Sequence, residues 1–296
     1  MTASDPQPKQ VLVARLSGPL QSWGEHSPYT HRGSVPYPTY SGLLGLMRAA
    51  LGSSRQSDPA SWAWLRALGM VVRIDAPGSI VRDFHTVNPP PADAWASTVG
   101  SGRKGSKATG IPFTVPNGEG KLWSAQKPIE GAPRRPSTLV SERIYLSDAA
   151  FTLLVDGPAE RVAQLAAALT RPEWQLSLGR KACAPDWPLV LGRRSGEVFD
   201  LAGEVPIVEP AKARRSSGAF GEPDGAAPLT GTAELHSLNG RPAPASASTV
   251  THSDDPVGSH PHAGHTPRVR HVTQVTAPLT DRPGLRAWAS THLDPP

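Results

Sequence analysis

Apolar and polar positions along the first half of the chain predict a short series of strands and helices. Residues 10–16 alternate between the two faces of an extended segment, which predicts a first strand. Leucines and other apolar residues then recur every three or four positions after Thr39. This spacing predicts a helix that begins after this N-cap residue and ends at Gly52.

Later segments show the same two periods. We expect a second helix over residues 59–68, strands over 70–75 and 79–87, and a strand over 142–156 that bends at Ser147 and Asp148. Next come an Ala-rich helix over 158–169, a Gly- and Arg-bearing loop over 176–194, a strand over 268–276 and a turn of helix over 283–292. This order predicts an α+β fold with a ferredoxin-like (RNA-recognition-motif-like) antiparallel sheet.

Composition divides the chain into three expected parts. Residues 10–87 and 141–195 hold most of the predicted elements and are expected to form the ferredoxin-like core. Residues 88–140 form a long insertion, which we expect to be functional or mobile because such connections are uncommon within compact domains. Residues 196–296 are expected to be a partly disordered, Pro-, Gly- and His-rich C-terminal extension, with low-complexity sequence over 211–267.

Basic charge is concentrated in one segment. Residues 101–145 hold eight lysines and arginines against three glutamates, and this excess equals the formal net charge of +5 of the whole chain. Clustered cations favour a polyanionic partner, because neutralising phosphates releases counterions and supplies most nucleic-acid affinity. A solvated basic loop without a partner is the alternative.

The loop before the first helix offers a second feature suited to RNA. Backbone N–H groups at Ser41 and Gly42 would lie at the positive end of the helix dipole, which suits an anionic backbone. Stacking rings accompany Arg32 here, as in sites for single-stranded RNA; they are Trp23, Tyr29, Tyr37 and Tyr40. Burial of Trp23 and Tyr40 in the core is the alternative explanation.

Signatures of common enzymes are absent from the sequence, which contains no P-loop, G-x-S-x-G, H-E-x-x-H or C-x-x-C motif. A metal-independent ribonuclease would need a general base, such as His85 or His26, and a nearby cation. Stacking or hydrogen bonding by His85 without reaction is favoured over this alternative. The histidines between residues 252 and 265 lie in a Pro- and Gly-rich stretch and are interpreted as a solvated linker, so we expect no metal and no cofactor.

Two further features bear on cellular location. The single cysteine, Cys183, excludes an internal disulfide framework and fits a reducing cytoplasm. No run of about 18 apolar residues and no signal-peptide core occurs in the sequence, so we expect a cytoplasmic protein with no membrane partner.

Five sequence blocks resemble the Cas-five family of CRISPR-associated proteins, and within it the CasD group of type I-E Cascade surveillance complexes. They are LSGPLQSWGE at 16–25, YPTYSGLLGLMRAALG at 37–52, RDFHTV at 82–87, ERIYLSDAAFTLLV at 142–155 and LGRKACAPDWPLVLG at 178–192. The resemblance covers the first two-thirds of the chain well and the last third weakly.

The resemblance implies a non-catalytic subunit that binds the 5′ handle of the CRISPR RNA and caps a backbone filament in antiviral defence. It also implies a protruding thumb, formed here by the basic insertion of residues 88–140. The implied partners are this RNA, the Cascade backbone subunit, the Cascade large subunit, and target DNA indirectly through the complex. An endoribonuclease that processes precursor CRISPR RNA, as in type I-C systems, is the alternative.

Arg143 falls where the family places a handle-contacting arginine at the base of the thumb, and it is the first candidate for an RNA contact. The other candidates lie in matching motifs or in basic segments; they are Trp23, Gly24, Arg32, Ser41, Gly42, Arg82, His85, Arg103, Lys104, Lys107 and Arg180. Pro36 and Tyr40 stand where relatives tend to carry arginines. We expect the basic thumb to replace the charge that is missing there.

Overall fold

The computed structural model describes residues 9–24, 31–54, 57, 59–87, 139–186, 188–208, 230–238, 247–256 and 265–296. The chain divides into two compact units. The larger holds Met1–Glu25, Ser34–Val81 and Tyr145–Pro296, and the smaller holds His26–Gly33 and Arg82–Ile144. Among the described residues, no helix is both long and apolar enough to cross a membrane.

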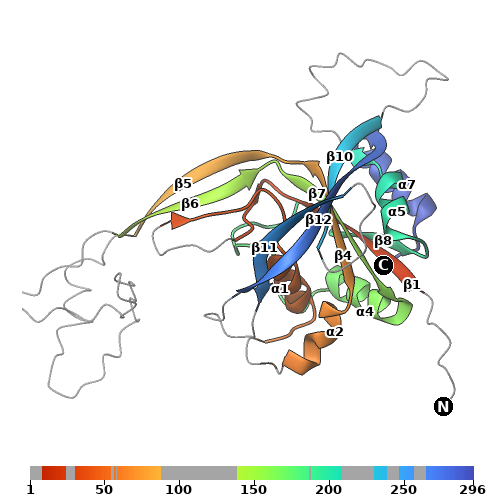
Figure 1. Cartoon of the computed structure of the whole chain (residues 1–296), viewed down its shortest axis with the longest axis horizontal. Coiled ribbons are helices and arrows are strands. Elements are labelled where there is room, and N and C mark those ends of the chain that lie inside the picture. The colour runs from red at the N-terminus through yellow and green to blue at the C-terminus, as the bar shows by residue number, and fades with distance from the viewer. Residues whose placement is uncertain are drawn as a thin grey trace, which may run out of the picture. The chain divides into compact units, whose positions relative to one another are not determined.

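One sheet organises the larger unit. Its strands are β1 (Lys9–Ser17), β4 (Gly69–Ala76), β7 (Ala150–Pro158), β8 (Val190–Arg194), β9 (Ile207–Val208), β10 (Thr230–Ser237), β11 (Ser248–Pro256) and β12 (His265–Thr280). Their order is β11-β12-β10-β4-β7-β1-β8, and all these neighbours are antiparallel, whereas β9 pairs in parallel with β12. The structure therefore confirms a mixed α+β architecture on an antiparallel sheet (Figure 1).

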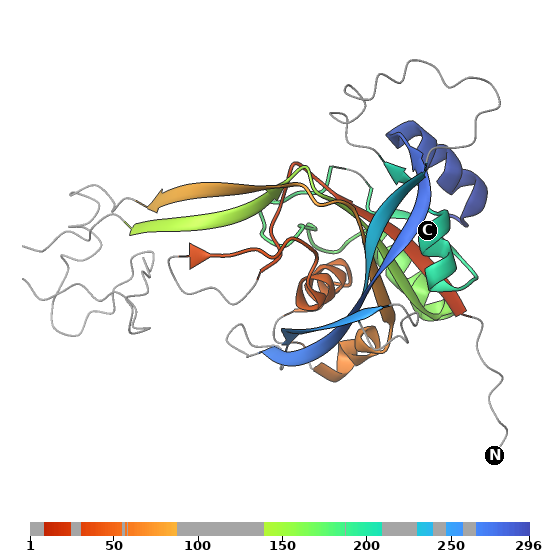
Figure 2. The same cartoon turned by 45° about the horizontal axis from the view of Figure 1, so that its top comes forward.

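Alternating side chains of the central strands build two apolar cores on opposite faces of this sheet. Leu12 and Leu16 of β1 join the core beneath α1 (Tyr40–Ala50) and α4 (Ala159–Thr170). Val11 and Val13 join the core beneath α5 (Val198–Glu204) and α7 (Arg282–His292). The expected two-faced alternation of residues 10–16 is thus confirmed, and Figure 2 shows the two helix pairs on either side of the sheet.

The first helix begins and ends where the sequence predicts. Thr39 is extended, and its Oγ1 accepts a hydrogen bond from the Gly42 N–H at 3.3 Å. At the other end, Gly52 has a φ of +69°, the left-handed conformation that favours glycine after a helix.

Replacing Thr39 by alanine is expected to lower the free energy of unfolding by about 1 kcal/mol, because the Gly42 N–H loses its partner. Urea unfolding of the two proteins measures this difference. Thr39→Ser, which keeps the accepting oxygen, serves as the control and should lose little stability. An equal loss in both variants would contradict the capping role.

Of two other local predictions, the first is confirmed in part and the second in full. The helix expected over residues 59–68 is a 3₁₀ turn, η1 (Pro59–Trp62), followed by the short α2 (Ala63–Arg66), because Trp62 leaves helical backbone geometry. The expected bend at Ser147–Asp148 is confirmed as the turn between β6 (Leu139–Ser147) and β7, where Asp148 has a φ of +56°.

The second half of the chain differs most from expectation. Residues 211–267 were expected to be mostly low-complexity and largely disordered, which is wrong for β10 and β11. β10 lies inside the sheet, between β12 and β4, and buries Ala233 and Leu235. The expected loop over 176–194 likewise ends in strand β8, which pairs with β1. β10 and β11 are flanked by Ala-, Pro- and Ser-rich sequence, which hides their strand pattern, and β8 is only five residues long.

A buried charged cluster ties the sheet to α5. The Asp75 carboxylate is fully buried and accepts hydrogen bonds from Arg73 Nε at 2.6 Å, Arg15 Nη1 at 3.2 Å and Thr152 Oγ1 at 2.7 Å. Arg73 also donates to backbone carbonyls at the end of α5, including that of Val205 at 2.6 Å. Burial lowers the pKa of Arg15, and the charge of Asp75 opposes this shift. The charges in this cluster are therefore paired, because a single unpaired charge buried in the protein interior would be strongly destabilising.

The smaller unit contains β3 (His31–Arg32) and the outer parts of β5 (Ser79–Val87) and β6. β3 pairs in parallel with β6, so that His31 lies opposite Glu142 and Arg32 lies opposite Arg143. β5 also pairs with β6. The strand expected over 79–87 is confirmed. The insertion expected to form the thumb falls, over residues 88–138, outside the described residues.

Candidate functional site

Trp23 lies in the core rather than on the surface. Its indole has no exposed area and donates a hydrogen bond through Nε1 to Gln21 Oε1 at 3.1 Å. The Trp23 ring also packs under α1, where a Cβ added to Gly42 would lie 2.9 Å from it. The alternative of burial therefore holds for Trp23, and its indole is not available to stack on RNA. Gly42 is needed here for close packing.

Tyr37 and Tyr40 each lie beneath a guanidinium from β12. Arg268 Cζ is 4.4 Å from the ring centre of Tyr40, and Arg270 Cζ is 4.0 Å from that of Tyr37. Tyr40 is buried, as its alternative explanation stated. Two arginines of β12 thus lie beside the segment in which Pro36 and Tyr40 stand where relatives tend to carry arginines. Sequence reasoning missed both, because β12 is more than 220 residues away along the chain.

Next to these pairs, His236 of β10 is buried and touches the ring of Tyr37 edge-on, with 5.1 Å between ring centres. Its Nε2 lies 2.8 Å from Glu234 Oε1. Burial and the positive charge of Arg270 lower the pKa of His236, and Glu234 opposes them. The neutral imidazole is therefore favoured in this cluster.

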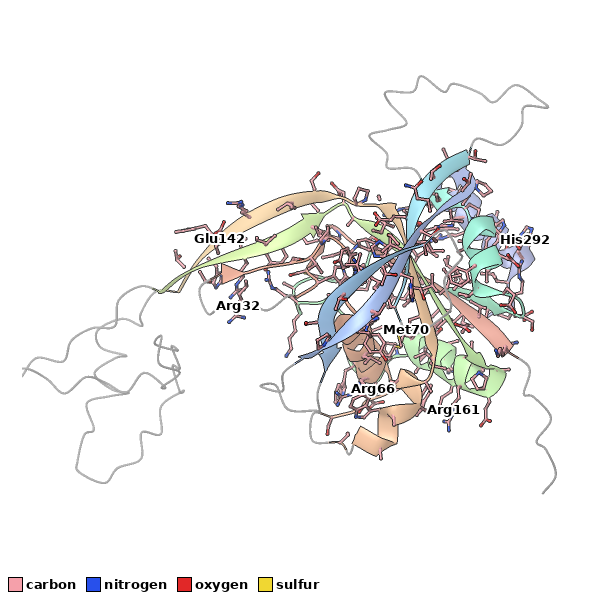
Figure 3. All side chains as sticks on the ribbon, viewed as in Figure 1. Arg32, Arg66, Met70, Glu142, Arg161 and His292 are labelled. Carbon is pink, nitrogen blue, oxygen red and sulfur yellow. The ribbon has the colours of Figure 1, made fainter. Side chains whose placement is uncertain are left out.

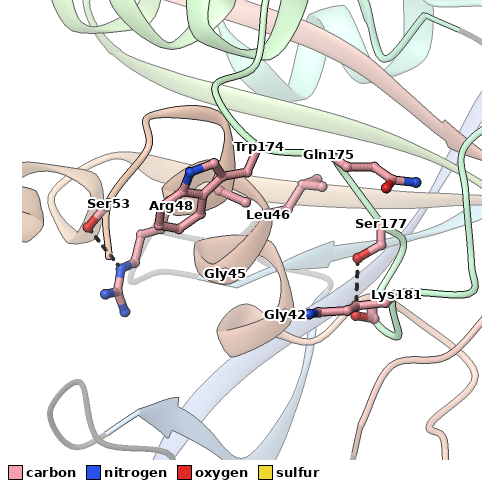
Figure 4. Close-up of a pocket in the computed structure, with 11 residues that line it drawn as sticks. Gly42, Gly45, Leu46, Arg48, Ser53, Trp174, Gln175, Ser177 and Lys181 are labelled. Atoms are coloured by element: carbon pink, nitrogen blue, oxygen red, sulfur yellow. Dashed lines mark hydrogen bonds between the residues drawn. The ribbon is translucent and has the colours of Figure 1, made fainter. Parts of the chain in front are cut away.

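A groove of about 750 Å³ runs along the outer face of α1 (Figure 4). We call it the α1 groove. The helix contributes Gly42, Gly45, Leu46 and Arg48, and the segment after α4 contributes Trp174 and Lys181 across from them. Backbone hydrogen bonds hold that segment to the helix end, since the Trp174 N–H donates to the Ala49 carbonyl at 3.3 Å. Gly42, whose backbone N–H was expected at the positive end of the helix dipole, lines this groove.

Positive charge lines the α1 groove without a carboxylate among its described lining residues. Arg48 is held in place, because it donates to Ser53 Oγ at 3.4 Å and to the Ser54 carbonyl at 2.9 Å, and it stacks 4.4 Å from the ring centre of Trp62. Its partial burial lowers its pKa. Lys181 is exposed. The groove therefore suits an anionic occupant.

The turn that carries Arg180 and Lys181 is fixed by the backbone. The Leu178 N–H donates to the Cys183 carbonyl at 2.7 Å, and Gly179 has a φ of +92°. Arg180, an RNA-binding candidate from the sequence, stacks 4.8 Å from the ring centre of Tyr145. Its sequence neighbour Lys181, which the sequence reasoning did not single out, lines the α1 groove.

In the smaller unit, three of the expected RNA-binding arginines belong to paired strands. Arg32 and Arg143 are register partners, and Arg82 Nη1 lies 3.5 Å from Glu142 Oε1. Figure 3 labels Arg32 and Glu142 on these strands. The Arg143 Nε is buried and has no hydrogen-bond partner among the described residues, whereas the Arg82 side chain is 74% exposed. The strand pairing therefore concentrates positive charge at the base of the insertion.

The remaining candidates are dispersed. Ser41 is half-buried in the first turn of α1, His85 is half-buried on β5, and Gly24 is exposed, with no described residue within 4 Å of a Cβ built on it. The described residues hold no group of three or more His, Cys, Asp or Glu side chains that could bind a metal ion. Several candidates lie outside the described residues; they are His26, Tyr29, Arg103, Lys104 and Lys107.

Comparison with known proteins agrees with the sequence blocks. The Cascade subunit CasD of the CRISPR system of Escherichia coli (strain K12) is 27% identical over 186 residues, which is 59% of this chain and 67% of that protein. A solved chain of a CRISPR RNA-guided surveillance complex is 28% identical, with a TM-score of 0.63 and coverage of 95% of this chain and 98% of that chain. A crystal structure of a Cas protein is 25% identical, with a TM-score of 0.52, over 90% of this chain and 95% of that one.

A family model described as CRISPR-associated protein (Cas_Cas5) matches residues 11–263, which is most of the chain. The match includes the strands and helices of both cores from β1 to α5, together with β10 and β11. The chain therefore belongs to the Cas5 family of CRISPR-associated proteins.

Proposed function

We propose that this chain is a non-catalytic RNA-binding subunit of a type I-E Cascade complex, which acts in the cytoplasm, binds the 5′ handle of the CRISPR RNA and caps the backbone filament. The observation that carries the proposal is the similarity, over 95% of the chain, to a chain of a CRISPR RNA-guided surveillance complex. The likeness to the E. coli Cascade subunit CasD supports the same assembly. We propose that the partners of this chain are the RNA, the backbone and large subunits, and target DNA through the complex.

The strand order supports the finer fold assignment within this proposal. β1, β4, β7 and β8 follow one another with α1 after β1 and α4 after β7, and they lie in the order β8-β1-β7-β4. This order agrees with a ferredoxin-like sheet and supports that assignment. The insertion of residues 88–140 follows β5 in the chain, runs into the start of β6, and is proposed to be the thumb. The cations at its base, Arg32 and Arg143, suit a phosphate backbone.

Purified full-length protein is expected to bind RNA that carries the 5′ handle in low salt with EDTA, and to leave precursor repeat RNA uncut. Electrophoretic mobility shift and denaturing gels measure the two properties. Cleavage that His85→Ala abolishes would instead establish the endoribonuclease alternative. Absence of binding to handle RNA, by the chain alone and by its assembly with the other subunits, would refute the proposal.

Replacing Arg143 by alanine is expected to weaken handle binding by about 1–3 kcal/mol, because a charged hydrogen-bond donor to phosphate or a base edge is lost. Equilibrium binding at fixed salt measures the change. Arg286→Ala, on the exposed surface of α7 in the larger unit, removes the same charge from another element and should bind as the wild type does. Equal losses of RNA affinity in both variants would show that Arg143 contributes only to the overall positive charge and makes no specific contact.

A further inference from the structure

Gly45 occupies an unusual place for a glycine. It lies in the middle of α1, its position is exposed, and a Cβ built on it would meet no atom of the described residues within 4 Å. Neither packing nor a left-handed backbone requires it, in contrast to Gly42, which makes room for Trp23. Glycine is among the least favourable residues in a helix interior. The absent side chain therefore keeps the α1 groove open at its centre.

The groove offers three different contacts along the helix. Arg48 lies toward the end of α1 and Gly42 toward its beginning, about 9 Å apart at the helical rise of 1.5 Å per residue. Lys181 adds an exposed cation from the facing segment, and Trp174 presents an indole that is 45% exposed. Two cations, a bare stretch of helix and an exposed ring thus share one cavity.

We propose that the α1 groove binds a nucleotide of single-stranded RNA, with its base stacked on Trp174, its phosphate at Lys181, and its sugar–phosphate chain against the helix at Gly45. This inference rests on the proposed function and names a site for that RNA. Charge complementarity selects the occupant, because the described lining carries cations and no carboxylate. Aromatic stacking of unpaired bases supplies sequence-tolerant affinity.

The size of the groove agrees with this occupant. A volume of about 750 Å³ lies within the range of small-ligand sites and holds about one or two nucleotides rather than a duplex. Because Ser53, Ser54 and the Trp62 ring fix Arg48, its positive charge is already placed before a ligand arrives. A preorganised cation loses little side-chain entropy on binding.

Substitutions at Gly45 separate binding from folding. Gly45→Ala and Gly45→Gln introduce better helix formers, so both are expected to raise Tm by about 2–4 °C. Gly45→Gln also fills the groove and is expected to weaken binding of handle RNA at least about tenfold, with a smaller loss for Gly45→Ala. The matched control is Gly203→Ala in α5, where the added Cβ makes only ordinary contacts. It should leave RNA affinity unchanged.

Trp174 provides the second measurement. Trp174→Ala is expected to weaken handle binding by about five- to a hundredfold, and Trp174→Phe should retain most of the affinity. If wild-type protein fails to bind handle RNA, the proposed function itself fails. If the wild type binds and the Gly45 and Trp174 variants bind equally well, only this inference is overturned. Loss of assembly with other Cascade subunits at unchanged RNA affinity would instead make the groove a protein interface and overturn it too.

Discussion

Replacing Asp75 by asparagine is expected to lower the free energy of unfolding by about 3–5 kcal/mol, because two buried guanidiniums would lose the carboxylate with which both form ion pairs. Arg73 has no exposed side-chain area, and that of Arg15 is 4% exposed, so neither charge can be rehydrated without opening the sheet. A loss of this size is a large fraction of the 5–15 kcal/mol that stabilises a typical protein. The two arginines lie on β4 and β1, the strands that flank β7 in the sheet.

Urea unfolding measures this loss, and a shifted midpoint with an unchanged slope would assign it to stability alone. The control is Glu204→Gln, which breaks the surface ion pair with Arg194 at 2.6 Å. Since that pair is partly exposed, its removal should cost at most about 1 kcal/mol. Similar small losses for Asp75→Asn and Glu204→Gln would show that the buried arginines find other partners.

Local signals explain why much of the fold could be predicted. The alternation of residues 10–16, the capping hydroxyl of Thr39 and the turn at Ser147–Asp148 are each set by neighbours a few residues away. β10 could not be recognised in the same way. Its stability comes from pairing with β4 and β12, which lie far from it in sequence, rather than from its own composition.

The residues of the candidate site divide in the same way, into those that local motifs predict and those that only the fold brings together. Gly42, Arg180 and Arg143 stand in motifs, so sequence reasoning reached them. Trp174 and Lys181 line the α1 groove only because the segment after α4 folds back onto the helix, where the Glu173 N–H donates to the Ala50 carbonyl at 3.0 Å. An exposed helical glycine before Arg48 was the one local signal that could have indicated this groove.

Replacing Gly179 by alanine is expected to cost about 2–4 kcal/mol of stability and to weaken RNA binding as well. The residue has a φ of +92°, and a Cβ there would lie 1.7 Å from the Ser22 carbonyl oxygen, so the turn cannot keep its place. The turn carries Arg180 over Tyr145 and presents Lys181 to the α1 groove. Displacing it would therefore move two cations at once.

Gly196→Ala separates the two causes of this loss. Gly196 also has a positive φ, +149°, but a Cβ there meets no atom within 4 Å in the part of the chain that the structure describes. The Gly196→Ala variant should lose only about 1–2 kcal/mol of stability, the cost of placing a side chain at a positive φ, and should keep wild-type RNA affinity. Thermal unfolding and RNA titration of both variants measure the two effects. If Gly179→Ala matched Gly196→Ala in both, the contact of the turn with Ser22 would not be what positions Arg180 and Lys181. A loss of RNA affinity confined to Gly179→Ala would place these cations among the residues that bind the RNA.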